Sequence, residues 1–475
     1  MTFVRNAKVM LAGFALAQAL PLLASPLLAR LYSPEAFGLQ TLFVSVTSVL
    51  LVAATLRLDL ATVIATDRRE ATRIFSLGVL QSLAIGLATA IAAAALAPTI
   101  STALGHPGQS DWVWAIAPMV IALATTQLAG GVLTWLKRFG PVSRAQVANQ
   151  FAYLGVAIGL GVVGSPLAGL VVAKLAGQIV AAASIAWLLR GFFRRVRVPQ
   201  RSAWSTLWVR CKPFLQFNTP YSLVGVVGRD VPVFAFAATS ATAAAGLYGL
   251  ARTLLWAPAM LVAASLSQVF YREAAEHRGT VRLERFTFAI LALTACAAAP
   301  LFAFVGTWGD VLFALLFGAE WTSAGRFAAL LAIPAWLAIQ TAWPERLFES
   351  VGRQGTSFAI QISFDLLSAA LVFGSVIAGR PAIETVAVFA AVNALFHVAF
   401  LIGLVRVAGF AAARLARTMG GAALIFALAA LGFHALRLAS AGSVIAMVAA
   451  GALAAAAALA LAWRFYRPVL ALEHE

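Results

Sequence analysis

Charged residues and cysteine are scarce in this sequence. Asp, Glu, Lys and Arg make up only 11% of the 475 residues, whereas hydrophobic residues make up 62% and the mean hydropathy is +0.93. A composition this apolar excludes a soluble globular protein. The two cysteines allow at most one disulfide, and Cys211 lies in a basic loop whereas Cys296 lies in an apolar run, so we expect no bridge.

Motifs for cofactor chemistry are also missing. No group of His, Cys and carboxylate residues has the spacing of a metal site, and no Gly-Lys-Ser or Gly-Lys-Thr phosphate-binding loop occurs. We therefore expect no metal, no other cofactor and no ATP hydrolysis by this chain.

Long apolar runs are the dominant feature. Runs of about 20 residues match the length of a membrane-spanning helix and favour helices over the weaker alternating segments of a transmembrane barrel. The first run follows Arg5 and Lys8, but its full spanning length favours an uncleaved helix over a signal peptide. The predicted fold class is all-α, a polytopic membrane protein of about fourteen transmembrane helices, at 9–29, 37–65, 73–97, 112–136, 145–163, 167–189, 214–238, 246–270, 287–306, 326–344, 356–378, 383–405, 418–438 and 443–463.

The basic residues predict which side of the membrane each loop faces. Of the 34 lysines and arginines, 26 fall in loops on the side of the N-terminus, four in the opposite loops and four inside spans. Because loops rich in Lys and Arg stay in the cytoplasm, we expect both termini to be cytoplasmic in a bacterial inner membrane. This spread also explains the net charge of +17 without nucleic acid, which would need cations gathered on one exposed face.

The most basic stretch, Arg190–Lys212, separates six predicted helices from the rest. We expect an N-terminal six-helix bundle at 1–190, a basic cytoplasmic linker at 191–213, a C-terminal six-helix bundle at 214–406, and two additional helices with a cytoplasmic tail at 407–475. Trp204, Leu207 and Trp208 in the linker suit either a short helix on an anionic membrane surface or a solvated connection.

Four cations fall inside the spans, where a charge costs roughly 3 kcal/mol or more unless it faces a polar interior. Cations there suit an anionic substrate, since Arg can bind phosphate through two hydrogen bonds. The predicted substrate-binding residues are Arg57, Lys174, Arg229 and Arg252. For Lys174 and Arg252, extension of the side chain to the membrane interface is an equally good explanation.

Three acids inside the spans are candidates for coupling to a proton or cation: Asp59, Asp230 and Asp365. Arg57 and Asp59 are two residues apart, so their side chains point about 200° apart on a helix and are not expected to pair with each other. Ion pairs with other helices that only stabilise the bundle remain an alternative role for both.

Several motifs resemble those of the O-antigen translocases called Wzx, which are oligosaccharide flippases of the multidrug/oligosaccharidyl-lipid/polysaccharide (MOP) exporter superfamily. The matching segments are Pro21–Pro26 (PLLASP), Arg30–Gly38 (RLYSPEAFG), Thr55–Ala61 (TLRLDLA), Ala245–Arg252 (AGLYGLAR) and Leu316–Trp321 (LFGAEW). The resemblance implies two six-helix bundles in a V, alternating access, and passage of an undecaprenyl-diphosphate-linked oligosaccharide from the cytoplasm to the periplasm. Its implied partners are that lipid-linked oligosaccharide and membrane lipids, with a polysaccharide polymerase and chain-length proteins as further candidates.

Two other functions are compatible with this topology. A cation-coupled multidrug or small-molecule antiporter of the same superfamily would favour intramembrane acids, and here the four cations outnumber the three acids. A membrane-embedded polysaccharide polymerase would need a large outer loop for its catalytic groups, but the predicted outer segments near 98–111 and 307–325 are short. We therefore expect a flippase and no enzymatic activity.

Overall fold

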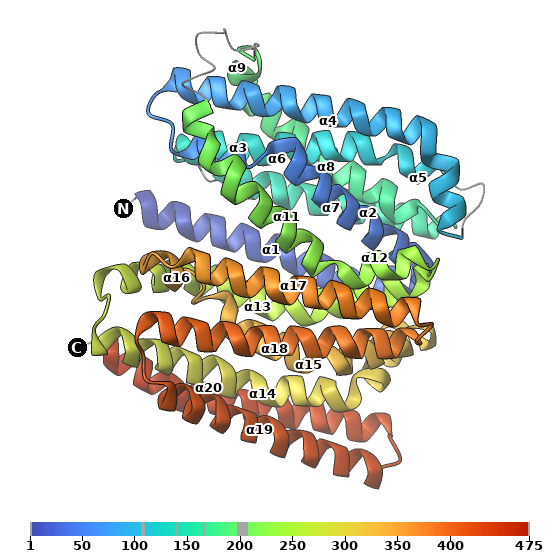
Figure 1. Ribbon diagram of the computed structural model, residues 1–475. Helices are drawn as coiled ribbons and strands as arrows, with labels where there is room; N and C mark the ends of the chain where they lie inside the picture. Colours follow the sequence, from blue (N-terminus) through green and yellow to red (C-terminus); the bar gives the residue numbers. More distant parts are fainter. Residues whose placement is uncertain (1, 106–109, 139, 165–166, 197–207, 474–475) are drawn as a thin grey trace. The chain divides into compact units, whose positions relative to one another are not determined.

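The computed structural model describes residues 2–105, 110–138, 140–164, 167–196 and 208–473 (Figure 1). Within these ranges every regular element is a helix and no strand occurs. Twelve described helices are long and apolar enough to cross a membrane, and one bent pair would make thirteen. The predicted all-α polytopic membrane fold is therefore confirmed.

The chain forms two compact units, of which the first comprises residues 1–246. This division does not test the domain boundaries predicted at 190, 213 and 406, which stay predictions. The linker residues Trp204 and Leu207 lie outside the described ranges. The helices of the first unit are α1 (Thr2–Leu31), α2 (Pro34–Thr55), α3 (Leu58–Val63), α4 (Arg68–Ala103), α5 (Asp111–Trp114), α6 (Ile116–Trp135), α7 (Gly140–Val162), α8 (Gly169–Leu188), α9 (Arg190–Phe193), a π-helical turn at Phe214–Asn218, α11 (Thr219–Arg229) and α12 (Val231–Ala238).

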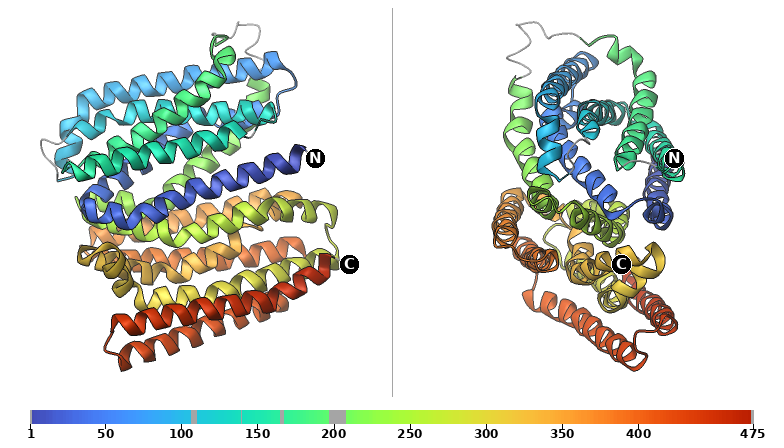
Figure 2. Two further views of the ribbon diagram at one scale, coloured as in Figure 1. Left: turned by 180° about the vertical axis from the view of Figure 1, so that it is seen from behind. Right: turned by 90° about the vertical axis from the view of Figure 1, so that its right-hand side faces the viewer.

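The second unit comprises residues 247–475 and is organised around α14. Helices α15, α19 and α20 all pack mainly against α14, and Figure 2 shows α19 and α20 side by side along it. Its helices are α13, which begins within the first unit (Thr242–Glu276), α14 (Val281–Phe317), a 3-10 turn at Ala319–Trp321, α15 (Thr322–Ala342), α16 (Leu347–Ser350), α17 (Gln354–Ile377), α18 (Ala382–Ala408), α19 (Ala412–Ala439) and α20 (Val444–Glu473).

The two longest described helices extend well beyond their predicted spans. Helices α4 and α14 contain 36 and 37 residues, whereas the predicted spans were 73–97 and 287–306. At 1.5 Å per residue, α14 is about 55 Å long and exceeds the roughly 30 Å hydrocarbon core. The extra turn at its N-terminus is polar and capped by Thr280, whose hydroxyl accepts a hydrogen bond from the Leu283 amide. Apolar length alone therefore underestimated these helices.

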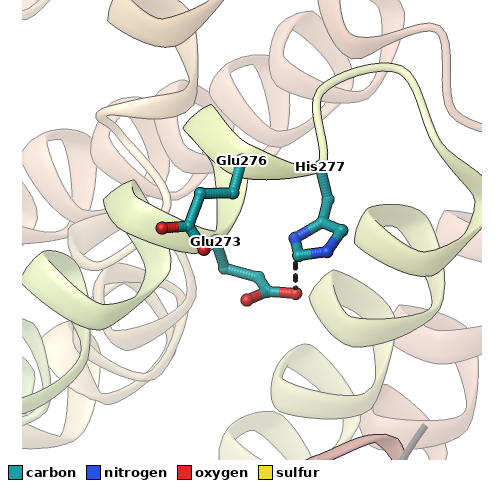
Figure 3. Close-up of side chains that lie close together, drawn as sticks. All are labelled: Glu273, Glu276 and His277. Carbon is teal, nitrogen blue, oxygen red and sulfur yellow. Dashed lines mark ion pairs between the residues drawn. The ribbon is translucent and has the colours of Figure 1, made fainter.

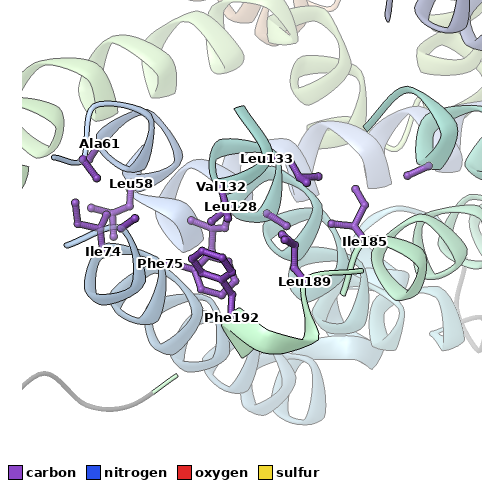
Figure 4. Close-up of a cluster of buried hydrophobic side chains, with 14 of the residues drawn as sticks. Leu58, Ala61, Ile74, Phe75, Leu128, Val132, Leu133, Ile185, Leu189 and Phe192 are labelled. Carbon is purple, nitrogen blue, oxygen red and sulfur yellow. The ribbon is translucent and has the colours of Figure 1, made fainter. Parts of the chain in front are cut away.

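The core of the first unit lies where α3, α4, α6, α8 and α9 converge (Figure 4). Leu58, Leu128 and Val132 are fully buried there, and Phe75 meets Phe192 edge to face at 6.1 Å. Because Leu58 opens α3, burial in this core holds α3 against α4 and α6. This packing sets the position of the polar residues that flank Leu58.

Candidate functional site

The second predicted span, 37–65, is broken at Arg57, between α2 and α3. Its start follows from sequence, because Ser33 caps α2 through a hydrogen bond to its hydroxyl from the Ala36 amide, and Pro34 occupies the first turn. The break does not follow from the sequence. Leu56 and Arg57 both adopt left-handed conformations there, with φ of 47° and 56°. Each costs a non-glycine residue of order 1–3 kcal/mol, and such conformations cluster at functional sites. The prediction of one continuous helix over 37–65 was wrong.

Neighbouring helices satisfy part of the broken backbone. The Gln81 side chain of α4 donates to the Ala53 carbonyl at 3.3 Å, in the last turn of α2. The indole of Trp135 donates to the Ala65 carbonyl beyond the end of α3 at 2.9 Å. Exposed carbonyls at a helix end otherwise lack partners inside a membrane. The break is therefore supported by side chains from two other helices.

Arg57 and Asp59, on either side of Leu58, have different surroundings. Asp59 accepts a hydrogen bond of 3.0 Å from the Gln127 side chain of α6. Arg57 is half-buried, and its buried Nε has no hydrogen-bond partner among the described residues. Neither side chain forms an ion pair with a described residue. Arg57 thus carries a positive charge that no described carboxylate offsets.

Gly131 explains how α6 comes close enough to bond Asp59. A Cβ atom at Gly131 would lie 2.5 Å from the Asp59 carbonyl oxygen, closer than real side chains approach. Gly131 follows Gln127 by four residues, so both lie on the face of α6 that meets α3. The glycine permits the contact and the glutamine completes it.

Lys174 lies in the same unit, on α8, and contacts an aromatic ring. Its Nζ lies 4.4 Å from the ring centroid of Tyr153 on α7, and the side chain is half-buried. Tyr153 is buried, and its hydroxyl accepts a 3.0 Å hydrogen bond from Gln40 on α2. Among the described residues Lys174 has no carboxylate partner, so it is a second uncompensated cation. A cation over an aromatic ring is stabilised by about 0.5–1 kcal/mol at an exposed site and by about 2 kcal/mol or more when the contact is desolvated.

A second polar contact joins α7 to α8 one turn away. The Asn149 side-chain amide donates to the Gln178 carbonyl oxygen at 2.7 Å, and the Gln178 amide donates to the Thr126 hydroxyl at 2.8 Å. Gly177 allows this approach, because a Cβ atom there would lie 2.6 Å from the Asn149 carbonyl. Together with Gln40, Tyr153 and Lys174, these residues form a polar seam between α2, α6, α7 and α8.

Sequence reasoning overlooked the neutral members of this seam, namely Gln40, Thr126, Asn149, Tyr153 and Gln178, and also Gln127, the partner of Asp59. It weighed only charged side chains inside spans. A usable signal was present, since Asn149 and Tyr153 are four residues apart, as are Lys174 and Gln178. Two polar pairs at that spacing on consecutive spans predict polar faces that meet.

Arg229 and Asp230 are paired with each other, which the sequence did not predict. Two hydrogen bonds of 3.3 and 3.2 Å join the guanidinium to the carboxylate. Asp230 is almost completely buried, whereas about half of the Arg229 side chain is exposed. The pair lies at the 60° bend between α11 and α12. The pairing reduces the net charge that Arg229 offers an anion, and the roles predicted for both residues stay predictions.

The predicted residues of the second unit are Arg252 and Asp365. Arg252 on α13 is half-buried, and its guanidinium carbon lies 5.9 Å from the ring centroid of Tyr248. Asp365 on α17 accepts a 2.8 Å hydrogen bond from Gln361 on the same helix. The structure thus places Arg57, Asp59, Lys174, Arg229 and Asp230 in the first unit and these two in the second.

One group of described side chains has the spacing of metal ligands. Possible ligand atoms of Glu273, Glu276 and His277 lie within 4.8 Å of one another (Figure 3). Arg272 pairs with Glu276 at 2.8 Å and Arg282 pairs with Glu273 at 3.2 Å. The hydrogen bond from Arg272 holds the pKa of the Glu276 carboxyl below its usual range. Both carboxylates already have cationic partners, so we assign no metal here.

Comparison with known proteins identifies one family and several solved structures with a similar fold. A family model described as polysaccharide biosynthesis protein matches residues 27–326. None of the curated proteins is similar enough in sequence to match.

Three solved structures of low sequence identity share the fold. The lipid II flippase MurJ, in an inward closed conformation, is 12% identical with a TM-score of 0.74, over 97% of this chain and 99% of that one. An inward-facing multidrug resistance MATE transporter of the MOP superfamily is 17% identical with a TM-score of 0.61, over 85% and 98%. A MOP transporter from Pyrococcus furiosus is 16% identical with a TM-score of 0.53, over 85% and 95%. The MOP-type fold expected from the sequence motifs is confirmed.

Proposed function

Because the chain belongs to the polysaccharide biosynthesis protein family, we propose that it is a flippase for an undecaprenyl-diphosphate-linked oligosaccharide. The cargo is an O-antigen or other polysaccharide repeat unit, carried from the cytoplasmic to the periplasmic leaflet of a bacterial inner membrane. Both termini are cytoplasmic in this proposal. The fold shared with the lipid II flippase MurJ supports a lipid-linked cargo.

The observation that carries the proposal is the uncompensated positive charge of Arg57 and Lys174. Neither side chain has a carboxylate partner among the described residues, although both belong to apolar helical regions. A lone cation inside the hydrocarbon core costs roughly 3 kcal/mol or more, unless a polar ligand or water contacts it. A diphosphate supplies the missing negative charge.

Arg57 and Lys174 would contact a phosphate in different ways. Arg57 can present a planar fork of donors to a phosphate, and the partnerless Nε is one of them. Lys174 offers a compact charge whose position is set by the ring of Tyr153. No covalent step is required, since the cargo only changes leaflet. Division of the chain into two compact units supports alternating access by rocking of one unit against the other.

Coupling to an ion is assigned to the acids that lack cationic partners. Asp59 bonds only Gln127, and Asp365 bonds only Gln361, among described side chains. A proton or monovalent cation binding at Asp59 would weaken its bond to Gln127 beside the helix break. Asp230 is less suited to this role because Arg229 already neutralises it.

Cells that lack their own O-unit flippase provide the test. We expect wild type to restore surface polysaccharide, and Arg57→Ala and Lys174→Met to leave lipid-linked oligosaccharide on the cytoplasmic leaflet at normal protein levels. Arg57→Lys should retain part of the activity, because it keeps the charge but loses the bidentate fork. Arg380→Ala is the matched control, since Arg380 is an exposed cation that pairs only with Glu384. Full activity of both Arg57→Ala and Lys174→Met would remove these cations from the mechanism.

A cation-coupled multidrug or small-molecule antiporter remains the rival function, favoured by the fold shared with the MATE transporter. It predicts that Asp59→Asn and Asp365→Asn abolish drug resistance conferred by the chain, whereas Arg57→Ala does not. A flippase predicts no drug resistance from wild type at all. Measuring resistance and surface polysaccharide in the same strains separates the two.

A further inference from the structure

An apolar groove opens on the second unit between α15, α18 and α19. Its volume is about 540 Å³, within the range of ordinary ligand sites. Val398, Ile402 and Arg406 line it from one face of α18, at helical spacing. Ala412 and Ala416 line it from α19, and their small side chains leave the space open. Arg406 is the one charged residue in the lining.

An aromatic ring from α15 also lines the groove. Trp336 of α15 is buried and contributes to the lining, and its ring lies 5.3 Å from that of Phe426 on α19. From Ala412 to Ala423, the deepest lining residue on α19, the helix rises by about 16 Å. This depth is about half of the roughly 30 Å hydrocarbon core. The groove therefore matches one leaflet of a bilayer in length.

Three arginines lie near the end of the groove at the junction of α18 and α19. Arg406 lines the groove, and Arg414 and Arg417 lie in the first turns of α19. Arg414 lies 3.6 Å from Glu284, and Arg417 donates to the Ala413 carbonyl of its own helix. The exposed Arg406 guanidinium has no hydrogen bond or ion pair with any described residue. Of these three cations, only Arg414 has a carboxylate partner among the described residues.

We propose that this groove holds an acyl chain of an anionic phospholipid, with Arg406 bound to its phosphate. We expect an anionic headgroup, because three arginines attract an anionic lipid more strongly than a zwitterionic one. We expect a phospholipid tail, because a groove as long as one leaflet accommodates a phospholipid chain but not the eleven isoprene units of an undecaprenyl lipid. The leaflet is the cytoplasmic one if the predicted topology holds. This site is independent of the cargo assigned above.

Native mass spectrometry of the purified full chain, titrated with phosphatidylglycerol, tests the proposal. We expect wild type to retain one tightly bound phosphatidylglycerol and to bind phosphatidylcholine more weakly. Arg406→Gln should weaken phosphatidylglycerol binding about fivefold, since it removes one cation from the headgroup region. Ala416→Phe should abolish tight binding by filling the groove, and Ile402→Trp should do the same from the opposite wall. Arg464→Gln, an exposed arginine on α20 outside the groove, should bind like wild type.

Three results would overturn the proposal. Equal retention of phosphatidylglycerol and phosphatidylcholine would remove the role of charge. Wild-type binding by folded Ala416→Phe and Ile402→Trp, with folding checked by thermal unfolding, would place the lipid elsewhere. A loss of undecaprenyl phosphate binding in those variants, with phosphatidylglycerol retained, would assign the groove to the cargo tail. Because lipid retention is read without transport, these outcomes do not depend on the proposed flippase activity.

Discussion

Replacing Arg437 by alanine should loosen the contact between α19 and α14. Arg437 donates to both carboxylate oxygens of Asp310, at 2.9 and 2.8 Å, and also to the Thr307 carbonyl. Its guanidinium carbon lies 5.6 Å from the ring centroid of Trp308. Both side chains are about three-quarters buried, so solvent screens this pair less than an exposed one. A hydrogen bond to a charged group contributes about 1.5–3 kcal/mol to the free energy of unfolding.

A double-mutant cycle gives the magnitude directly. We expect a coupling free energy of about 2 kcal/mol between Arg437 and Asp310, measured by equilibrium unfolding of the purified chain in mixed micelles. The matched control is the exposed pair Arg380 and Glu384, four residues apart on the chain, for which about 0.3–0.5 kcal/mol is expected. Equal coupling energies for the two pairs would refute the claim that this bidentate contact fastens α19 to α14.

Two further predictions concern the first unit and the topology. Gly177→Leu should destabilise the protein by about 2 kcal/mol or more and lower activity, because its Cβ would lie 2.6 Å from the Asn149 carbonyl oxygen. Gly155→Leu is the control and should change stability little, because the space around Gly155 is open. Equal unfolding midpoints for the two variants would contradict the close packing of α7 on α8. A cysteine at Asp111 should react with an impermeant thiol reagent added outside intact cells, and one at Gln354 should not; the opposite labelling would reverse the topology.

The fold could be predicted from the sequence because hydrophobic length alone identifies spanning helices. What apolar length could not reveal is how helices end and break. The extra N-terminal turn of α14 is polar and stabilised by a cap, and the break at Arg57 contains neither Gly nor Pro, the residues that normally interrupt a helix. That break depends on Gln81 and on the packing of Leu58, both of which are tertiary contacts.

The sequence predicts which charged residues lie inside the spans, but not which side chains contact them. Arg57 and Lys174 stand out in apolar runs, so hydropathy finds them. Pairing of Arg229 with Asp230 was hidden, because adjacent residues in a straight helix point about 100° apart, and only the end of α11 at Arg229 brings the two groups together. Neutral polar partners such as Gln127 were hidden because their hydropathy penalty is small beside that of a charge.

Flipping by the purified chain in vesicles is the most direct test of the central claim. Vesicles would carry an undecaprenyl-diphosphate-linked oligosaccharide in both leaflets, and an impermeant glycosidase would cleave the sugars exposed outside. With wild-type protein we expect the inner-leaflet pool to become fully cleavable over time, and with Arg57→Ala to remain protected as in protein-free vesicles. Protection of the inner pool with correctly folded wild-type protein, under every ion gradient applied, would contradict the account.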